Sequence, residues 1–177
     1  MSARPRNGVA ALTLACALGI LLLACTPPPA AGLSPGPASI LGRYAHTYNA
    51  RVPEMLDGFL AADYETVIVK PPQVMFMDRA TVIESVTNML EDEETTKVTI
   101  TFEPGYNVVE DDTKGVWRIE NLRSTLRLEF AEGSSKGVPE YEMTTCSTLY
   151  VCESTTGEAT FEILREVIFE GVGCEDE

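Results

Sequence analysis

The sequence has little positive charge and few of the residues that build common catalytic centres. It contains 13 Lys and Arg against 27 Asp and Glu, a formal net charge of −14. Because such a chain repels nucleic acid and anionic lipid headgroups, we expect no nucleic-acid partner. His46 is the one histidine, and there is no CxxC or His/Cys cluster, so we expect no metal. No phosphate loop or nucleophile elbow occurs, and no cofactor is implied.

The sequence also lacks an apolar run long enough to span a bilayer. The longest, Val9–Leu23, falls short of the roughly 20 residues that a spanning helix needs. It follows Arg4 and Arg6, ends in Leu22-Leu23-Ala24-Cys25 and is followed by Thr26 and three prolines. A positive leader, a short apolar core and small residues at its end are typical of a secretory signal peptide.

The end of this run, Leu22-Leu23-Ala24-Cys25, resembles the lipobox of bacterial lipoproteins, in which the cysteine becomes the lipidated N-terminus after cleavage. The alternative is that Cys25 is only a small apolar residue at the end of a conventional signal. The resemblance implies a signal peptide over residues 1–24 and a membrane anchor through the lipid on Cys25, where two or more acyl chains hold stably. Thr26 after the cysteine implies the outer membrane of a bacterial envelope, facing the periplasm or the surface.

Residues 25–37 are rich in proline and glycine and predict a semi-extended tether without its own core. The folded domain is then residues 38–177. It contains three cysteines, of which Cys146 and Cys152 would lie ~20 Å apart in one unbroken strand, too far for a bridge. A disulfide of Cys174 with Cys146 or with Cys152 is therefore the more plausible pairing.

The first half of the domain shows helical stripes and short strands. Apolar spacing predicts helices over residues 38–51 and 53–62, the second with proline in its first turn. Residues 66–69 and 74–76 predict short strands. Asp78 is a good N-cap for a third helix, which ends unfavourably in a run of four acids.

The second half alternates with a period of two. It predicts strands over residues 97–110, 116–130, 140–153 and 159–170. Within the second of these the apolar positions change from odd to even, which predicts a β-bulge near Glu120-Asn121. In the last strand we expect one face to carry five apolar residues: Ala159, Phe161, Ile163, Val167 and Phe169.

This order of elements resembles the NTF2-like superfamily, which includes SnoaL-like and ketosteroid-isomerase-like proteins. The resemblance covers about residues 38–171, with local matches at residues 44–50 and at Leu60-Ala61-Ala62-Asp63. It implies an α+β cone in which three N-terminal helices pack on a curved antiparallel sheet of four long strands plus short strands. The rival, a lipocalin-like barrel, would not explain three helices before the long strands.

The resemblance implies a pocket between the helices and the concave face of the sheet. Ketosteroid isomerases carry an aspartate base near the first strand, whereas residues 66–70 here contain no carboxylate. The candidates that remain for catalysis are Tyr44 and Tyr48, which share a helix face, together with Asp63. The same tyrosines and Trp117 are candidates for lining a ligand pocket.

Two functions follow from these observations. The first is a lipid-anchored envelope protein whose domain binds a small apolar ligand or a protein partner without catalysis. The second is an enzyme of the hydratase, dehydratase or isomerase type with a pocket lined by tyrosine and aspartate. A dimeric scaffold, in which two sheets pair face to face, is a third.

Overall fold

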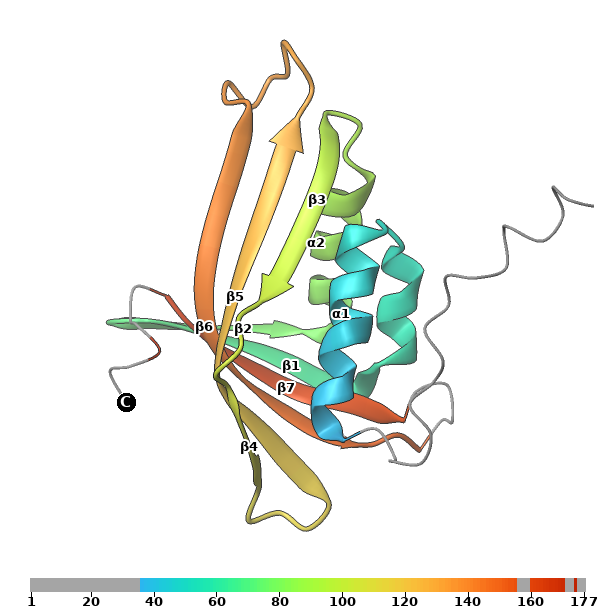
Figure 1. Cartoon of the computed structure of the whole chain (residues 1–177), viewed down its shortest axis with the longest axis vertical. Helices are drawn as coiled ribbons and strands as arrows, with labels where there is room; N and C mark the ends of the chain where they lie inside the picture. The colour runs from blue at the N-terminus through green and yellow to red at the C-terminus, as the bar shows by residue number, and fades with distance from the viewer. Residues whose placement is uncertain (1–35, 156–159, 171–173, 175–177) are drawn as a thin grey trace, which may run out of the picture. The chain divides into compact units, whose positions relative to one another are not determined.

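The computed structural model describes residues 36–155, 160–170 and 174 (Figure 1). The predicted signal peptide, Cys25 and nearly all of the tether lie outside these residues. No helix within the described part of the chain is long and apolar enough to cross a membrane. The elements are η1 (Pro37–Ser39), α1 (Ile40–Asn49), η2 (Pro53–Gly58), β1 (Leu60–Lys70), β2 (Gln73–Asp78), α2 (Arg79–Glu91), β3 (Thr95–Phe102), β4 (Asn107–Glu110), β5 (Val116–Phe130), β6 (Glu140–Glu153) and β7 (Phe161–Phe169), where η marks a 3-10 helix.

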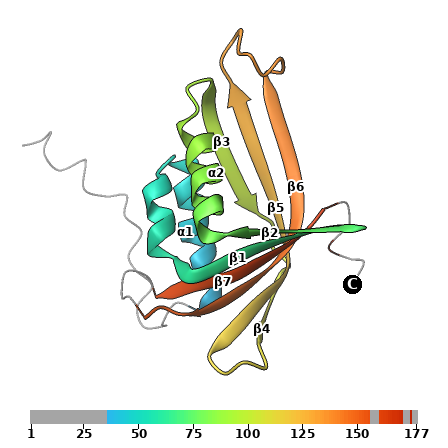
Figure 2. The same ribbon diagram turned by 180° about the vertical axis from the view of Figure 1, so that it is seen from behind.

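The strands form one curved sheet in the order β2-β1-β7-β6-β5-β3, with β4 paired to the first part of β5. Helices α1 and α2 and the 3-10 helix η2 lie against one side of it, which we call the inner face (Figures 1 and 2). Strands β1 and β7 pair in parallel and the other pairs are antiparallel. The predicted α+β class is confirmed, and the four long strands of the prediction pair antiparallel, but β1 joins β7 in parallel, so the sheet as a whole is mixed.

The predicted second helix, over residues 53–62, is the largest error in the helical half. The helix is a short 3-10 segment that ends at Gly58, and Leu60 already belongs to β1. The cause is long-range pairing, because Ile163 N donates a 2.8 Å hydrogen bond to Phe59 O, and Leu60 lies beside Ile163 in the sheet. An apolar stripe of this length does not reveal such a partner.

Helix α2 begins and ends through identifiable hydrogen bonds. Asp78 is its N-cap, as predicted, and accepts a 2.8 Å bond from Thr81 N. At the other end, Arg51 has a left-handed backbone (φ 56°) and its guanidinium donates to three carbonyls. The acceptors are Leu90 O at 2.6 Å, Thr95 O at 2.6 Å and Asp92 O at 3.1 Å. A cation at this position offsets the acids that crowd the helix C-terminus.

Two of the four register shifts recorded along the strand pairs, those in β5 and β7, turn side chains from one face of the sheet to the other. The predicted bulge in β5 lies between Ile119 and Leu122, both 0% exposed, with Asn121 at φ 55°. A second shift, which the sequence did not predict, leaves Leu164 without a partner, because Tyr150 pairs with Arg165 but Val151 pairs with Ile163.

The second shift changes which residues of β7 face the helices. Phe161 and Ile163 are in the core before it, and Glu166 faces inward after it. The expectation that Val167 and Phe169 share the face of Ile163 was therefore wrong. Ala159, the remaining member of that predicted face, lies outside the described residues.

The end of the chain is tied to β6 by a disulfide between Cys146 and Cys174, with Cα atoms 5.4 Å apart. Of the two partners that the sequence left open for Cys174, the structure has Cys146. Cys152 is a free thiol, half-buried on the same strand. Burial, and then the carboxylate of Glu162, raise the pKa of this thiol, so it resists ionisation.

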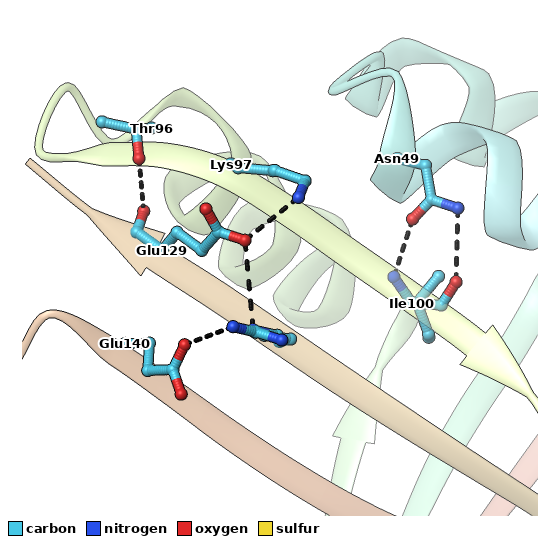
Figure 3. A network of polar contacts seen from close by, with 7 residues as sticks. Asn49, Thr96, Lys97, Ile100, Glu129 and Glu140 are labelled. Carbon is cyan, nitrogen blue, oxygen red and sulfur yellow. Dashed lines mark hydrogen bonds and ion pairs between the residues drawn. The ribbon is translucent and has the colours of Figure 1, made fainter.

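Strand β3 is an edge of the sheet, and α1 closes part of it. The side-chain amide of Asn49 binds both backbone groups of Ile100 (Figure 3), accepting from its N at 2.7 Å and donating to its O at 3.2 Å. The side-chain amide of Asn49 thus occupies the two backbone hydrogen-bonding groups that a neighbouring strand would otherwise pair with. A covered edge cannot add another strand at that point.

Candidate functional site

A pair of stacked tyrosines from α1 forms one side of the candidate site. The rings of Tyr44 and Tyr48 have centroids 5.1 Å apart and an interplanar angle of 9°, and their hydroxyl oxygens are 3.4 Å apart. Phe59 and Phe102 also contact the Tyr44 ring. The shared helix face expected from the i, i+4 spacing is thus found, and it points into the aromatic part of the core.

A carboxylate from β7 faces these tyrosines. Tyr44 Oη donates to Glu166 Oε2 at 3.4 Å, and Tyr64 Oη on β1 donates to the same oxygen at 3.3 Å. Tyr64 Oη also lies 2.7 Å from Thr66 Oγ1. We call Tyr44, Tyr48, Tyr64 and Glu166 the tyrosine–glutamate cluster. It joins one helix and two neighbouring strands on the inner face.

The environment of Glu166 favours its neutral form. Burial of the carboxyl raises its pKa to about 7 from the ordinary 4.5, although the tyrosine hydroxyls lower it by stabilising the charge. Ser147 on β6 also lowers the pKa of Glu166, although the buried Oγ of Ser147 has no hydrogen-bond partner of ordinary geometry. The carboxyl therefore exchanges its proton near neutral pH, as a general acid or base must.

The hydroxyls of the cluster remain protonated. Burial and the Glu166 charge raise the pKa of Tyr44, Tyr48 and Tyr64 well above 10. They act as hydrogen-bond donors to the carboxylate and stay out of proton exchange. The cluster therefore has one exchangeable proton, on the carboxyl group of Glu166. That carboxyl group accepts hydrogen bonds from neutral tyrosine hydroxyls and is surrounded by aromatic rings.

Asp63, the predicted acidic partner of the tyrosines, lies on the opposite face. It is exposed, whereas Tyr64 beside it is 3% exposed and points inward, as neighbours in a strand must alternate. Asp63 lines a hollow on the outer face together with acids, a base and apolar residues: Glu65, Asp111, Thr113, Val116, Tyr150, Leu164 and Arg165. The structure therefore does not bring Asp63 to the tyrosines.

The other sequence candidates lie away from the cluster. His46, the one histidine of the sequence, is exposed on α1. Trp117 contacts Phe161 edge-on, with centroids 5.7 Å apart, near the other end of the inner face. No group of three His, Cys, Asp or Glu side chains that could hold a metal occurs in residues 36–155 and 160–170 or at 174.

Part of the inner face beyond the helices is apolar and uncovered. Met75 is 45% exposed, and it lies opposite Ile68, which follows Thr66 on the inner side of β1. On β6, Tyr141 and Met143 are 48% and 37% exposed and lie opposite core-packed leucines of β5. Two residues beyond Glu166 on β7, Ile168 pairs with Ile68 and leads toward this uncovered part.

Comparisons with solved structures identify the fold. An NTF2-like superfamily protein from Salmonella enterica matches with a TM-score of 0.55 and 9% identity, over 74% of this chain and 85% of that one. The Kfla4162 protein from Kribbella flavida matches with a TM-score of 0.55 and 10% identity, over 76% and 87%. Naphthalene 1,2-dioxygenase with indole bound in its active site matches with 0.52 and 12%, over 75% and 76%.

These likenesses show that the domain has an NTF2-like fold, as the order of its elements predicted. Neither a protein-family model nor a curated protein sequence matches the chain. At identities near 10% the likeness extends to the fold alone.

Proposed function

We propose that this chain is a lipid-anchored protein of the bacterial cell envelope whose NTF2-like domain binds a small apolar ligand without catalysis. The observation that carries the proposal is the uncovered apolar part of the inner face at Met75, Tyr141 and Met143. The register places Met75 level with Ser147 of β6, across β1 and β7, so Met75 lies apart from Tyr141 and Met143, but all three expose apolar surface on the inner side of the sheet. Exposed apolar surface of this kind is typical of interaction sites. The two bonds from tyrosines satisfy Oε2 of Glu166 without any ligand, which supports a binding role over a catalytic one.

Neighbouring residues of β2 offer a matched test of this binding face. Met75 lies on the inner face and Val74 on the outer face, and both are about half exposed, at 45% and 52%. We expect the neutral fluorescent probe N-phenyl-1-naphthylamine to bind the full chain. Met75→Glu should weaken binding about tenfold, because it places a charge in an apolar site.

Val74→Glu adds the same charge on the same strand and should leave the affinity for the probe unchanged. Equal losses in the two variants would show that binding is not on the inner face. No binding by the unmodified chain would remove the proposal.

The anchor is tested separately at Cys25. The leader carries Arg4 and Arg6, so its removal takes the formal net charge from −14 to −16, and electrostatics alone would repel the domain from anionic lipid. Cys25→Ala should therefore move the protein from the membrane fraction to the soluble fraction or strand it unprocessed. A variant that still fractionates as a mature membrane protein would exclude the lipobox interpretation.

A second function, proton transfer of the isomerase or dehydratase type, is favoured by Glu166. Its pKa of about 7 and its position beside the tyrosines suit a general base acting on an apolar substrate. In that step the carboxylate would take a proton from the carbon next to a carbonyl and return one after exchange with solvent. The carbonyl oxygen would accept a hydrogen bond from a tyrosine.

Deuterium incorporation into 2-tetralone, followed by NMR, tests this second function. Catalysed incorporation that is lost in Glu166→Gln would support it and would overturn the non-catalytic proposal. A rate equal to that of buffer would leave binding as the function.

A further inference from the structure

Strand β6 extends beyond β7, and over the described residues it has no neighbouring strand on one side there. It pairs with β5 from Glu140 onward, but its pairing with β7 begins only at Cys146 opposite Phe169. In the described part of the chain, no strand lies on the second side of residues 140–145. We call these six residues, Glu140 to Thr145, the β6 edge. All of them except Thr145 are exposed.

The register shows which backbone groups of the β6 edge face outward. Phe130 N donates to Pro139 O at 2.9 Å, so this pair is hydrogen-bonded. Bonded and non-bonded pairs alternate along an antiparallel ladder. Tyr141 and Met143 therefore bond to β5, whereas the amide and carbonyl groups of Glu140, Glu142 and Thr144 point to the open side. These groups form a template for an added strand.

The edges of the sheet at β3 and β2 differ from the β6 edge. On β3, Asn49 already occupies the backbone groups of Ile100. On β2, the exposed residues Val74, Met75 and Phe76 carry no charge that would select a partner. The β6 edge combines open backbone groups with two kinds of side chain, apolar on the inner face and acidic on the outer face.

These side chains define the partner that would fit. Tyr141 and Met143 are 48% and 37% exposed on the inner side. Glu140 and Glu142 are exposed on the outer side, where Glu140 pairs with Arg127 at 2.5 Å (Figure 3) and Glu142 adds further negative charge. A strand alternating apolar and basic residues would match both faces at once.

We propose that the β6 edge binds an extended segment of a partner protein that alternates apolar and basic side chains, as an added strand of the sheet. The charge of the chain argues for this occupant and against a second copy. Two copies, each with a net charge of −14, would bring Glu140 and Glu142 of both edges together, whereas a basic segment is attracted by the same residues.

A fluorescent peptide of alternating lysine and valine is the probe, added to the full chain at low salt. We expect binding, with slowed amide exchange at Glu140, Glu142 and Thr144 and little change at Tyr141 and Met143, which β5 already protects. A peptide N-methylated at alternate residues removes the donors, and a glutamate–valine peptide reverses the charge. Neither should bind.

Two variants separate the backbone contribution from the charge contribution. Thr144→Pro removes an outward amide without breaking a backbone bond to β5, although it loses the exposed 3.1 Å hydroxyl contact with Thr125, and should weaken binding of the lysine–valine peptide about fivefold. Glu142→Lys should weaken it about threefold and admit the glutamate–valine peptide. Glu54→Lys, exposed on η2, makes the same change in net charge and should alter neither.

Three results would overturn the proposal. The first is absence of binding by the unmodified chain, and the second is protection that arises at β2 or β4 in place of the β6 edge. The third is concentration-dependent dimerisation, seen by sedimentation, that protects Glu140, Glu142 and Thr144 without peptide, because the occupant would then be a second copy.

Discussion

Glu166 and Asp63 lie on neighbouring strands of one sheet, yet they are different chemical groups. Glu166 faces the helices, accepts bonds from two tyrosines and has its pKa raised by burial. Asp63 faces outward into a hollow with Glu65, which is ion-paired to Arg165. Arg165 on β7 lines the same outer hollow as Asp63, whereas Glu166, the next residue of β7, faces the helices. A shift of one position along the strand therefore decides which of the two environments a side chain has. The environment of an acid on this sheet, and hence its pKa, thus depends on which face it occupies.

The largest expected effect is at Glu166. Its folded-state pKa is raised, so the folded protein binds the proton more tightly than the unfolded chain, and stability falls as pH rises from 4.5 to about 7. This corresponds to about 3 kcal/mol at higher pH. Glu166→Gln should therefore raise the free energy of unfolding by up to about 3 kcal/mol at about pH 9 and leave it nearly unchanged at about pH 5.

Urea denaturation at the two pH values measures this difference. Parallel stability curves for the two proteins across the range would show that the carboxyl is not buried, and the contrast with Asp63 would disappear.

A smaller effect is expected from the tyrosine that donates to Glu166 from β1. Tyr64→Phe removes the hydroxyl partner of Thr66 and one of the two donors to Glu166, and should cost about 1–2 kcal/mol of unfolding free energy. It should also raise the pKa of Glu166 further, because the Tyr64 hydroxyl stabilises the carboxylate. The midpoint of the pH dependence of stability reports that shift.

The matched control for this variant is Tyr150→Phe in the outer hollow. It should change stability by less than about 0.5 kcal/mol, as surface substitutions usually do. An equal loss from the two substitutions would mean that the inner hydroxyl has no special role.

The smallest effect is expected at Asp63. Asp63→Asn removes a carboxylate that is exposed and belongs to neither the core nor the cluster, so stability should change by less than about 0.5 kcal/mol. The shape of the stability–pH curve should be that of the unmodified protein. If Asp63→Asn lost the pH dependence of stability between pH 4.5 and 7, the titrating group would be Asp63 on β1 and not Glu166 on β7.

The sequence predicted what depends on local patterns. Tyr44 and Tyr48 share a face because residues four apart on a helix must. Asp78 caps α2 through a bond to Thr81, three residues away, and the bulge at Asn121 showed itself as a change from odd to even apolar positions. Each of these features is formed by residues near one another in the chain.

The sequence could not predict what depends on distant pairing. The stretch from Leu60 to Asp63 carries a helical pattern, but β7 holds it in the sheet, and Tyr64 thereby turns inward while Asp63 turns outward. Glu166 was missed because the shift at Leu164 was not recognised, which assigned Val167 to the core. Ile168, an apolar residue out of phase with Ile163, was the available signal.

Arg51 has a consequence for how the domain opens. Its side chain leaves the end of α1 and binds carbonyls some 39 to 44 residues later, at the end of α2 and the start of β3. Displacement of Arg51 would therefore release three charge-assisted bonds at once, to the last turn of α2, to its C-cap and to β3. The end of α1, the end of α2 and the start of β3 are thus joined into one cooperative unit, so a loss of order at the end of α1 is transmitted to α2 and β3.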